Sequence, residues 1–256
     1  MRNIVQAARL NPSKGVIEIG SGIGALTQHL ADEAGKVVAI EIDRRFMPVL
    51  QEQFAAQGHV VFENQDVLKM NLHILIATHF KEVSALSVVA NLPYYATTPI
   101  IMKLLEEKLP LEYIVVMVQK EVAERMKAKP GSKDYGSLSI AVQYYCETEW
   151  VCNVPHTVFI PPPQVDSAVI RLTVRKQSPV DVKDEVVFFQ VVRASFAQRR
   201  KTIFNNLMFA FFRKGQKEAL TAILEGCGID PTRRGETLSM EEYAKLSNAL
   251  LDARVL

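Results

Sequence analysis

The sequence predicts an α/β fold in which a doubly wound, mainly parallel sheet is followed by a small all-helical domain. Short β-branched runs alternate with longer amphipathic runs over the first two-thirds of the chain. This alternation changes after Lys129-Pro130-Gly131, and the pattern from Val186 onward is helical without strand-like runs. With 256 residues, the chain is long enough for one sizeable domain and a smaller one.

The alternating runs predict five strands joined by helices, and right-handed crossovers would arrange the strands in one sheet. The strands are expected at Val16–Ile19, Val37–Glu41, Val60–Glu63, Ser87–Ala90 and Tyr113–Val118. The helices are expected at Ala25–Glu33, Arg44–Ala56, Pro99–Lys108, Lys120–Ala128 and Leu138–Cys146. Two later segments, Thr148–Val154 and Ala168–Val174, predict an antiparallel edge on either side of Pro161-Pro162-Pro163. The polar stretch Arg175–Lys183 predicts the boundary between a first domain at 1–178 and a helical domain at 179–256.

The composition excludes several classes of protein. A chain with 48% hydrophobic and 23% charged residues is expected to fold, and no apolar run reaches the roughly 18 residues of a membrane span. Three cysteines without a CxxC pair argue against a disulfide framework and a zinc site, and the five histidines lack ligand spacing. We therefore expect a cytoplasmic protein that binds neither a metal ion nor a membrane. The sequence leaves the oligomeric state open, and a monomer is the expectation.

A glycine-rich turn follows the first expected strand, in Glu18-Ile19-Gly20-Ser21-Gly22-Ile23-Gly24. Glycines there allow a ligand to approach the backbone and the N–H groups of the next helix, which is typical of Rossmann-like folds. Glu41 ends the second strand and could accept the hydroxyls of a ribose, whereas Asp66 follows the third strand and could accept an adenine amino group. The expected cofactor contacts are Glu18, Gly20, Gly22, Glu41, Ile42, Asp66, Val67 and Asn91. At this stage a nicotinamide oxidoreductase remains an alternative, because Gly20, Gly22 and Ala25 also satisfy GxGxxG/A.

The fourth strand ends in Asn91-Leu92-Pro93-Tyr94, at the sheet edge where open α/β sheets bind ligands. An adenine amino nitrogen is a poor nucleophile, because its lone pair is delocalised into the ring. Two acceptors on its N–H bonds, the Asn91 side chain and the Leu92 carbonyl, would hold the nitrogen in line for attack. Pro93 would rigidify the loop, and Tyr94 offers a ring on which an extruded base can stack. This tetrapeptide resembles the (Asn/Asp/Ser)-(Pro/Leu/Ile)-Pro-(Tyr/Phe) motif of amino-group methyltransferases.

Further motifs narrow the resemblance. They are Asn91–Pro99, Gln119–Arg125, Tyr135–Ser139, Phe159–Val169 and Phe196–Thr202. Together they resemble the KsgA family of bacterial small-subunit rRNA adenine dimethyltransferases (the KsgA/RsmA and Dim family) over essentially the whole chain. The resemblance implies a class I S-adenosylmethionine methyltransferase that converts two adjacent adenines near the 3′ end of 16S rRNA, in an immature 30S subunit, to N6,N6-dimethyladenine. It also implies that Phe159 holds the target base opposite Tyr94.

The segment 191–234 is locally basic although the formal net charge is only +2. Its nine basic residues are Arg193, Arg199, Arg200, Lys201, Arg213, Lys214, Lys217, Arg233 and Arg234, against three acidic ones. A solvated helical face is the common alternative explanation of such a segment. Because the family's helical domain helps to dock the enzyme on the subunit, the resemblance gives Arg199, Arg200 and Lys201 a role in phosphate contact.

Members of the family begin with an extra segment that carries Gln-Asn-Phe-Leu and covers the cofactor. This sequence has about one helix before its first expected strand, so we expect an N-terminally truncated domain with a more open cofactor pocket. Two other functions remain open. One is a large-subunit rRNA adenine N6-methyltransferase of the macrolide-resistance type, and the other is a mainly non-catalytic assembly factor of the small subunit.

Overall fold

The computed structural model describes residues 1–159, 161–213 and 215–256. Ile160 of the Phe159–Val169 motif and Lys214 of the basic segment therefore lie outside the described residues. The chain forms two compact units, which we call the sheet unit and the helical unit. The sheet unit comprises Met1–Ala123 and Cys146–Arg175, and the helical unit comprises Glu124–Tyr145 and Lys176–Leu256.

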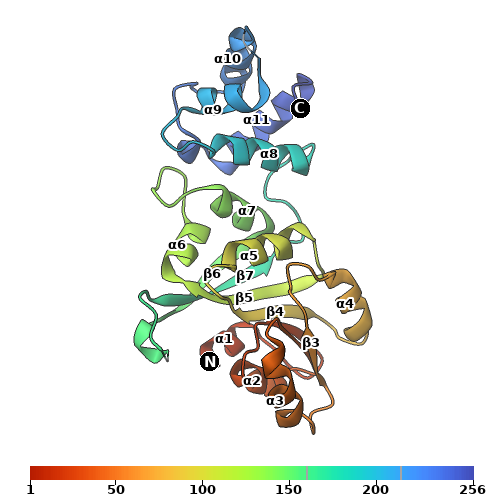
Figure 1. The fold of residues 1–256 in the computed structure, drawn as a ribbon. Helices are drawn as coiled ribbons and strands as arrows, with labels where there is room; N and C mark the ends of the chain where they lie inside the picture. Colours follow the sequence, from red (N-terminus) through yellow and green to blue (C-terminus); the bar gives the residue numbers. More distant parts are fainter. Residues whose placement is uncertain (160, 214) are drawn as a thin grey trace. The chain divides into compact units, whose positions relative to one another are not determined.

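The sheet unit is built on a seven-stranded mixed sheet in the order β3-β2-β1-β4-β5-β7-β6 (Figure 1). Strands β1 to β5 are parallel, whereas β7 pairs antiparallel with both β5 and β6. The strands are β1 Gly15–Ile19, β2 Lys36–Glu41, β3 Val60–Asn64, β4 Leu86–Asn91, β5 Leu111–Gln119, β6 Cys146–Val154 and β7 Ser167–Val174. The predicted fold class and the antiparallel edge are confirmed.

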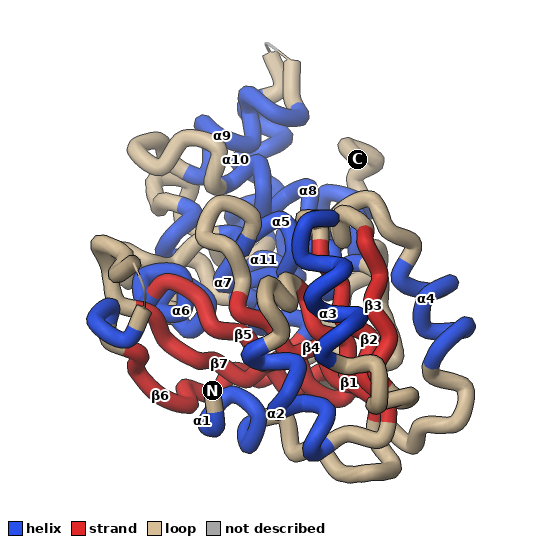
Figure 2. The backbone as a smooth tube through the Cα atoms, turned by 60° about the horizontal axis from the view of Figure 1, so that its bottom comes forward, coloured by secondary structure: helices blue, strands red, loops and turns tan. Residues whose placement is uncertain are grey.

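The central strands consist of continuous runs rich in β-branched residues. Val16 and Ile17 of β1 and Val88 and Val89 of β4 are completely buried, as expected of strands covered on both faces. Helices α1 to α3 lie on one face of the sheet and α5 on the other (Figures 1 and 2). The helices of this unit are α1 Arg2–Ala7, α2 Ala25–Glu33, η1 Arg44–Phe46, α3 Met47–Gln53, α4 Leu72–His79, α5 Thr97–Glu106 and η2 His156–Val158.

Two helices of the sheet unit differ from the expectation. The helix expected at 44–56 divides into a 3₁₀ turn and the shorter α3, whose first turn contains Pro48, a position at which a missing N–H costs nothing. Helix α4 was not expected between β3 and β4. Its start is marked by Asn71, whose side chain accepts the Ile74 N–H at 3.1 Å. The apolar residues of α4 do not lie on one face of the helix, since Ile74 is exposed whereas Leu72 and Leu75 are buried, so the sequence shows no clear helical periodicity there.

The helical unit includes Glu124–Tyr145, a segment that the sequence-based division placed in the first domain. Aromatic packing joins this segment to α8, since the Tyr144 and Phe188 rings stack with centroids 5.2 Å apart. Tyr145 also donates to the Glu185 carboxylate at 2.6 Å. The unit contains α7 Ser137–Tyr145, α8 Glu185–Ser195, α9 Ile203–Phe211, α10 Lys217–Gly226, η3 Gly235–Thr237 and α11 Met240–Asp252. Helix α6, Lys120–Lys127, begins in the sheet unit and ends in the helical unit.

Helices of the described part of the chain are all too short or too polar to cross a bilayer.

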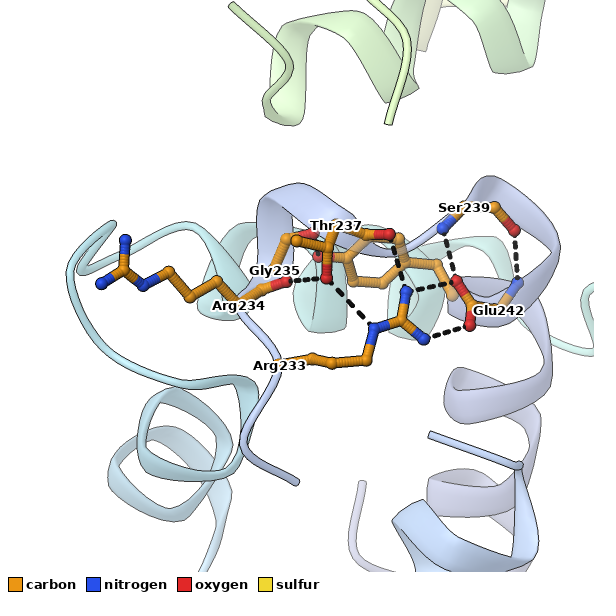
Figure 3. Close-up of polar contacts among 7 residues, drawn as sticks. Arg233, Arg234, Gly235, Thr237, Ser239 and Glu242 are labelled. Atoms are coloured by element: carbon orange, nitrogen blue, oxygen red, sulfur yellow. Dashed lines mark hydrogen bonds and ion pairs between the residues drawn. The ribbon is translucent and has the colours of Figure 1, made fainter. Parts of the chain in front are cut away.

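Within the helical unit, the start of α11 is fixed by the network in Figure 3. Arg233 donates to both carboxylate oxygens of Glu242 and to the Thr237 carbonyl. Ser239 and Glu242 form a capping box at the first turn of α11. The buried Tyr243 hydroxyl donates to the Gly235 carbonyl at 2.8 Å.

Replacing Gly235 by alanine should destabilise the helical unit. A Cβ there would lie 2.7 Å from the Ser195 carbonyl oxygen and 2.9 Å from the Tyr243 hydroxyl, so the backbone must shift. Gly235→Ala is expected to lower the free energy of unfolding in urea by about 1–3 kcal/mol. Gly226→Ala is the matched control, because a Cβ there meets no atom within 4 Å and alanine favours a helix. Equal effects of the two substitutions would contradict the packing argument.

Candidate active site

The carboxyl ends of the parallel strands bring the predicted site residues to one edge of the sheet. Gly20 follows β1, Glu41 ends β2, Asp66 follows β3 and Asn91 ends β4. The register supports this placement, because Ile19 of β1 pairs with Ala90 of β4. Residues that are up to 71 positions apart in the sequence therefore surround one site, as expected for an open α/β sheet.

The glycine-rich loop requires glycine for its backbone conformation. Gly20, Gly22 and Gly24 have φ values of +79°, +55° and +87°, in the left-handed region that other residues rarely adopt. The Gly20 N–H donates to the Ile40 carbonyl at 2.8 Å, which ties the loop to β2. At Gly24, the residue before α2, a Cβ would also lie 2.8 Å from the Phe54 ring.

Glu41 is a buried carboxylate whose orientation is fixed by backbone donors. Its Oε2 accepts the Gly22 N–H at 2.7 Å, and its Oε1 accepts the Asp43 N–H at 2.8 Å. A carboxylate offers about four acceptor positions, so two positions remain for hydroxyl donors of a ligand. The glycine-rich loop and the end of β2 are thus joined through the predicted ribose-binding group.

Glu18 is completely buried in β1 and lines neither of the two pockets described below. Its Oε2 accepts the Thr27 hydroxyl at 2.6 Å, whereas Oε1 has no hydrogen-bond partner among the described residues. Burial raises the pKa of the Glu18 carboxyl to about 7; the Thr27 hydrogen bond opposes this shift and the nearby Glu41 charge adds to it. At neutral pH this site therefore holds a carboxyl close to its titration midpoint.

A first pocket, of about 140 Å³, lies at the carboxyl ends of β1 to β4 and is here called the cofactor pocket. Its walls include Gly20, Ile42, Asp66, Val67, Pro93 and Tyr95. The Asp66 Oδ1 accepts the Leu68 N–H at 3.0 Å, which orients the carboxylate in the loop after β3. The predicted contacts Gly20, Ile42, Asp66 and Val67 therefore share one mainly apolar cavity.

A second pocket, of about 590 Å³, is here called the base pocket. Asn91 and Phe159 both line it, together with residues 1–4 and the end of β6 at Cys152–Val154. This volume lies within the range of roughly 300–1,000 Å³ typical of ligand sites. The β6 residues were not among the predicted site residues. The antiparallel pairing of β6 with β7 could have indicated them, because it brings the end of β6 beside the motif that begins at Phe159.

The loop after β4 presents two acceptors. Asn91 is exposed, and neither its carboxamide nor the Leu92 carbonyl takes part in a hydrogen bond among the described residues. The buried Leu92 donates its N–H to the Met117 carbonyl at 3.1 Å, which anchors the loop to β5. The Pro93 carbonyl accepts the Ala96 N–H at 3.0 Å, so the chain turns directly into α5.

Tyr94 lies in the same loop but lines neither pocket. Its hydroxyl is 3.0 Å from the Ser167 hydroxyl of β7, and 36% of the residue remains exposed. This hydrogen bond restricts the ring at its far end and leaves part of it accessible.

The predicted RNA-binding residues follow α8 in the helical unit, and the three differ in their contacts. Arg199 donates to the Lys133 carbonyl and lies 3.5 Å from the Glu236 carboxylate. Arg200 and Lys201 are exposed and form no ion pair among the residues that the structure describes. Arg200 and Lys201 are therefore more accessible to an external anion than Arg199.

A sheet with five parallel strands, a glycine-rich loop after β1, an acidic residue at the end of β2 and Asn-Leu-Pro-Tyr at the end of β4 defines a class I S-adenosylmethionine-dependent methyltransferase. The family model for ribosomal RNA adenine dimethylases matches residues 1–250, and the chain belongs to this family. The family membership confirms the predicted resemblance and removes the nicotinamide oxidoreductase alternative.

Known relatives agree with this assignment. The ribosomal RNA small subunit methyltransferase A of Geobacillus thermodenitrificans is 62% identical over 98% of this chain and 86% of its own length. The protein of the same name from Bacillus thuringiensis is 58% identical over the same shares. Among solved structures, a dimethyladenosine transferase from Plasmodium falciparum has a TM-score of 0.78 and 28% identity, covering 99% of this chain and 94% of its own. The 23S rRNA methyltransferase ErmE has a TM-score of 0.68 and 26% identity, covering 96% and 95%.

The raised pKa of Glu18 predicts a pH dependence of stability. Because the pKa in the folded state, about 7, lies above its ordinary value of 4.5, the folded protein holds the proton more tightly than the unfolded chain. The contribution of this group is therefore fully present below pH 4.5 and is lost as the pH rises through 7.

Glu18→Gln should remove this loss. Between pH 4.5 and 7, the free energy of unfolding of the original protein should fall more than that of the variant, by roughly 1–3 kcal/mol. Urea unfolding at several pH values measures the difference, and the exposed Glu52→Gln serves as the control. Parallel pH profiles for the original protein and Glu18→Gln would show that Glu18 does not titrate in this range.

Proposed function

We propose that this chain transfers methyl groups from S-adenosylmethionine to N6 of two adjacent adenines near the 3′ end of 16S rRNA, giving N6,N6-dimethyladenine during ribosome biogenesis. The observation that carries the proposal is the base pocket, which Asn91 and Phe159 line together at the carboxyl end of β4. Membership in the rRNA adenine dimethylase family supports the reaction, and the relatives named small subunit methyltransferase A support the choice of subunit.

The donor set at the sheet edge fits the cofactor. Glu41, oriented by two N–H groups, would accept the ribose hydroxyls, and Asp66 would accept the adenine amino group. Ile42 and Val67 supply apolar walls for the adenine. A Cβ on Gly22 would meet no atom within 4 Å and one on Gly20 only the Asn91 carbonyl at 3.7 Å, which leaves room for the methionine part. Glu18 would act behind this loop as a positioning residue through Thr27. When bound, S-adenosylmethionine supplies an electrophilic methyl group on a sulfonium sulfur.

The loop after β4 binds and activates the amino group of the target base. The Asn91 carboxamide oxygen and the Leu92 carbonyl oxygen accept hydrogen bonds from the two N–H groups of the adenine amino group, and this favours the pyramidal geometry that frees the nitrogen lone pair. Pro93 keeps these acceptors rigid. Phe159, which lines the base pocket, would hold the extruded base by stacking, and Tyr94, which does not line this pocket, would offer the accessible part of its ring. After methyl transfer the nitrogen is strongly acidic, so its proton leaves to these acceptors or to water without a strong general base.

The substrate is an immature 30S subunit, and the enzyme acts on it as a cytoplasmic monomer. The likeness to ErmE makes large-subunit rRNA the competing substrate. Labelled methyl transfer to small subunits, large subunits and naked rRNA from unmethylated cells decides between them. Label confined to small subunits is expected, and label confined to 23S rRNA would overturn the proposal.

Asn91→Ala tests the catalytic assignment and the assembly-factor alternative together. Without the carboxamide oxygen, one acceptor for the amino group is lost, and methyl transfer to immature small subunits should become undetectable. Subunit binding should stay within about twofold, because the helical unit is unchanged. Unaltered methyl transfer would refute the role of Asn91, and a mainly non-catalytic assembly factor would show no transfer even with the original asparagine.

Arg200 and Lys201 should contribute to the salt dependence of RNA binding. Replacing both by alanine is expected to reduce the slope of log K against log salt by up to about two. Arg199→Ala is the internal comparison and should change the slope less, because Glu236 and the Lys133 carbonyl already hold this guanidinium. An unaltered slope in the double variant would place both residues away from phosphate.

A further inference from the structure

The segment 199–217 combines positive charge with aromatic residues. It contains no aspartate or glutamate. Its basic residues are Arg199, Arg200, Lys201, Arg213, Lys214 and Lys217, and its aromatic residues are Phe204, Phe209, Phe211 and Phe212. Only the first three of these basic residues entered the proposed function. The remainder of the segment, which contains α9, has no role in it.

Helix α9 is attached to its unit along one side. Ile203, Asn206 and Leu207 are buried. The Asn206 carboxamide donates to the Ser195 carbonyl at 2.8 Å and to the Gln198 carbonyl at 3.2 Å, which fixes the loop that carries Arg200 and Lys201. These hydrogen bonds connect α9 to the end of α8 and to the residues just before this loop.

The other side of α9 exposes a large aromatic ring. Phe209 is 83% exposed, and the preceding Met208 and the following Phe211 and Phe212 are only half-buried. A single exposed apolar residue is common on protein surfaces. Here three apolar neighbours in the sequence are also partly exposed, so the end of α9 presents more apolar surface than one isolated residue would.

Cations lie beyond both ends of α9. Asn205 and Phe209 are spaced by four residues, which places them along one side of α9, and Lys201 precedes Thr202, the residue that caps the start of the helix. Arg213 follows the end of α9, where its backbone N–H donates to the Gln216 side chain at 2.7 Å. Neither Lys201 nor the Arg213 guanidinium forms an ion pair among the described residues. A ligand along this side of α9 would therefore meet an exposed ring on a helix that has an unneutralised cation beyond each end.

We propose that the exposed side of α9 is a binding surface for single-stranded ribosomal RNA, on which an unpaired base stacks against Phe209 while Lys201 and Arg213, beyond the two ends of the helix, contact phosphates of the same strand. Stacked rings between cations are the usual means of binding unpaired nucleotides. A protein partner is less well matched, because an apolar protein surface would leave these cations unpaired. The inference rests on the proposed function for the identity of the RNA, and it adds a base contact to the phosphate contacts of Arg200 and Lys201.

Tryptophan fluorescence tests the stacking directly. Trp150 is the single tryptophan of the chain, so Phe209→Trp adds a second signal against a known background. Naked 16S rRNA from unmethylated cells should quench the added fluorescence. Val186→Trp is the matched control, because Val186 is an exposed apolar residue of the same unit beside Asp184 and Glu185, and its signal should not change. If the added fluorescence of Phe209→Trp stayed unquenched at rRNA concentrations at which an independent binding assay shows that the variant has bound the rRNA, the proposal would be overturned.

Binding measurements separate RNA from protein as the partner. Phe209→Ala should weaken binding to naked 16S rRNA by about five- to a hundredfold, and Phe209→Tyr should restore most of it. Arg213→Gln should reduce the salt slope by about one. Val186→Ala should change neither quantity. If Phe209→Ala weakened binding only to assembled subunits and not to naked rRNA, a ribosomal protein would be the partner and the proposal would be wrong.

Methyl transfer distinguishes this inference from the proposed function. Phe209→Ala should raise the concentration of immature small subunits that is needed for half-maximal methyl transfer, because the ring contributes to RNA binding. If the original protein labelled no small subunits, the proposed function would fail while the fluorescence result still decided the RNA contact. If Phe209→Ala bound normally but lost transfer, the surface would not be an RNA-binding one.

Discussion

The parallel pairing of β4 between β1 and β5 is the constraint on which the candidate site depends. It sets Asn91 at the sheet edge beside the glycine-rich loop. The next residue is tied to β5, because the Leu92 N–H donates a hydrogen bond to the Met117 carbonyl at 3.1 Å. Side-chain hydrogen bonds could not provide this position, because the two proposed acceptors must stay free for the substrate. The backbone of the sheet therefore fixes the geometry, and the acceptors remain available.

The same arrangement is visible at the other strand ends. Glu41 uses two of its acceptor positions to bind backbone N–H groups, which orients it and leaves the others available. Tyr94 is fixed through its hydroxyl by Ser167, so its ring is restrained without being covered. In the helical unit, Asn206 holds the loop of Arg200 and Lys201 through backbone carbonyls, and the charged side chains remain exposed. In each case the structural hydrogen bonds leave available the acceptor positions, the ring or the charges that the proposed function needs.

Features encoded within a few residues could be predicted from the sequence, and those that depend on distant packing could not. The glycine-rich loop, Glu41 and Asn91 were predictable because each directly follows or ends a strand, and parallel strands share one edge. The affiliation of Glu124–Tyr145 with the helical unit depends on aromatic contacts with α8, which no local pattern encodes. Helix α4 was missed because its apolar residues do not follow a single face, and the β6 wall of the base pocket required the β6–β7 pairing.

The central claim is that an oxygen acceptor at position 91 activates the adenine amino group. The most direct measurement is the single-turnover rate of methyl transfer to immature small subunits by Asn91→Asp and Asn91→Leu, with both substrates saturating. The account predicts that aspartate, which keeps a side-chain oxygen, retains measurable transfer and that leucine, which is similar in size but lacks an acceptor, retains none. Equal rates for the two variants would contradict it, because the side-chain oxygen would then have no part in the reaction.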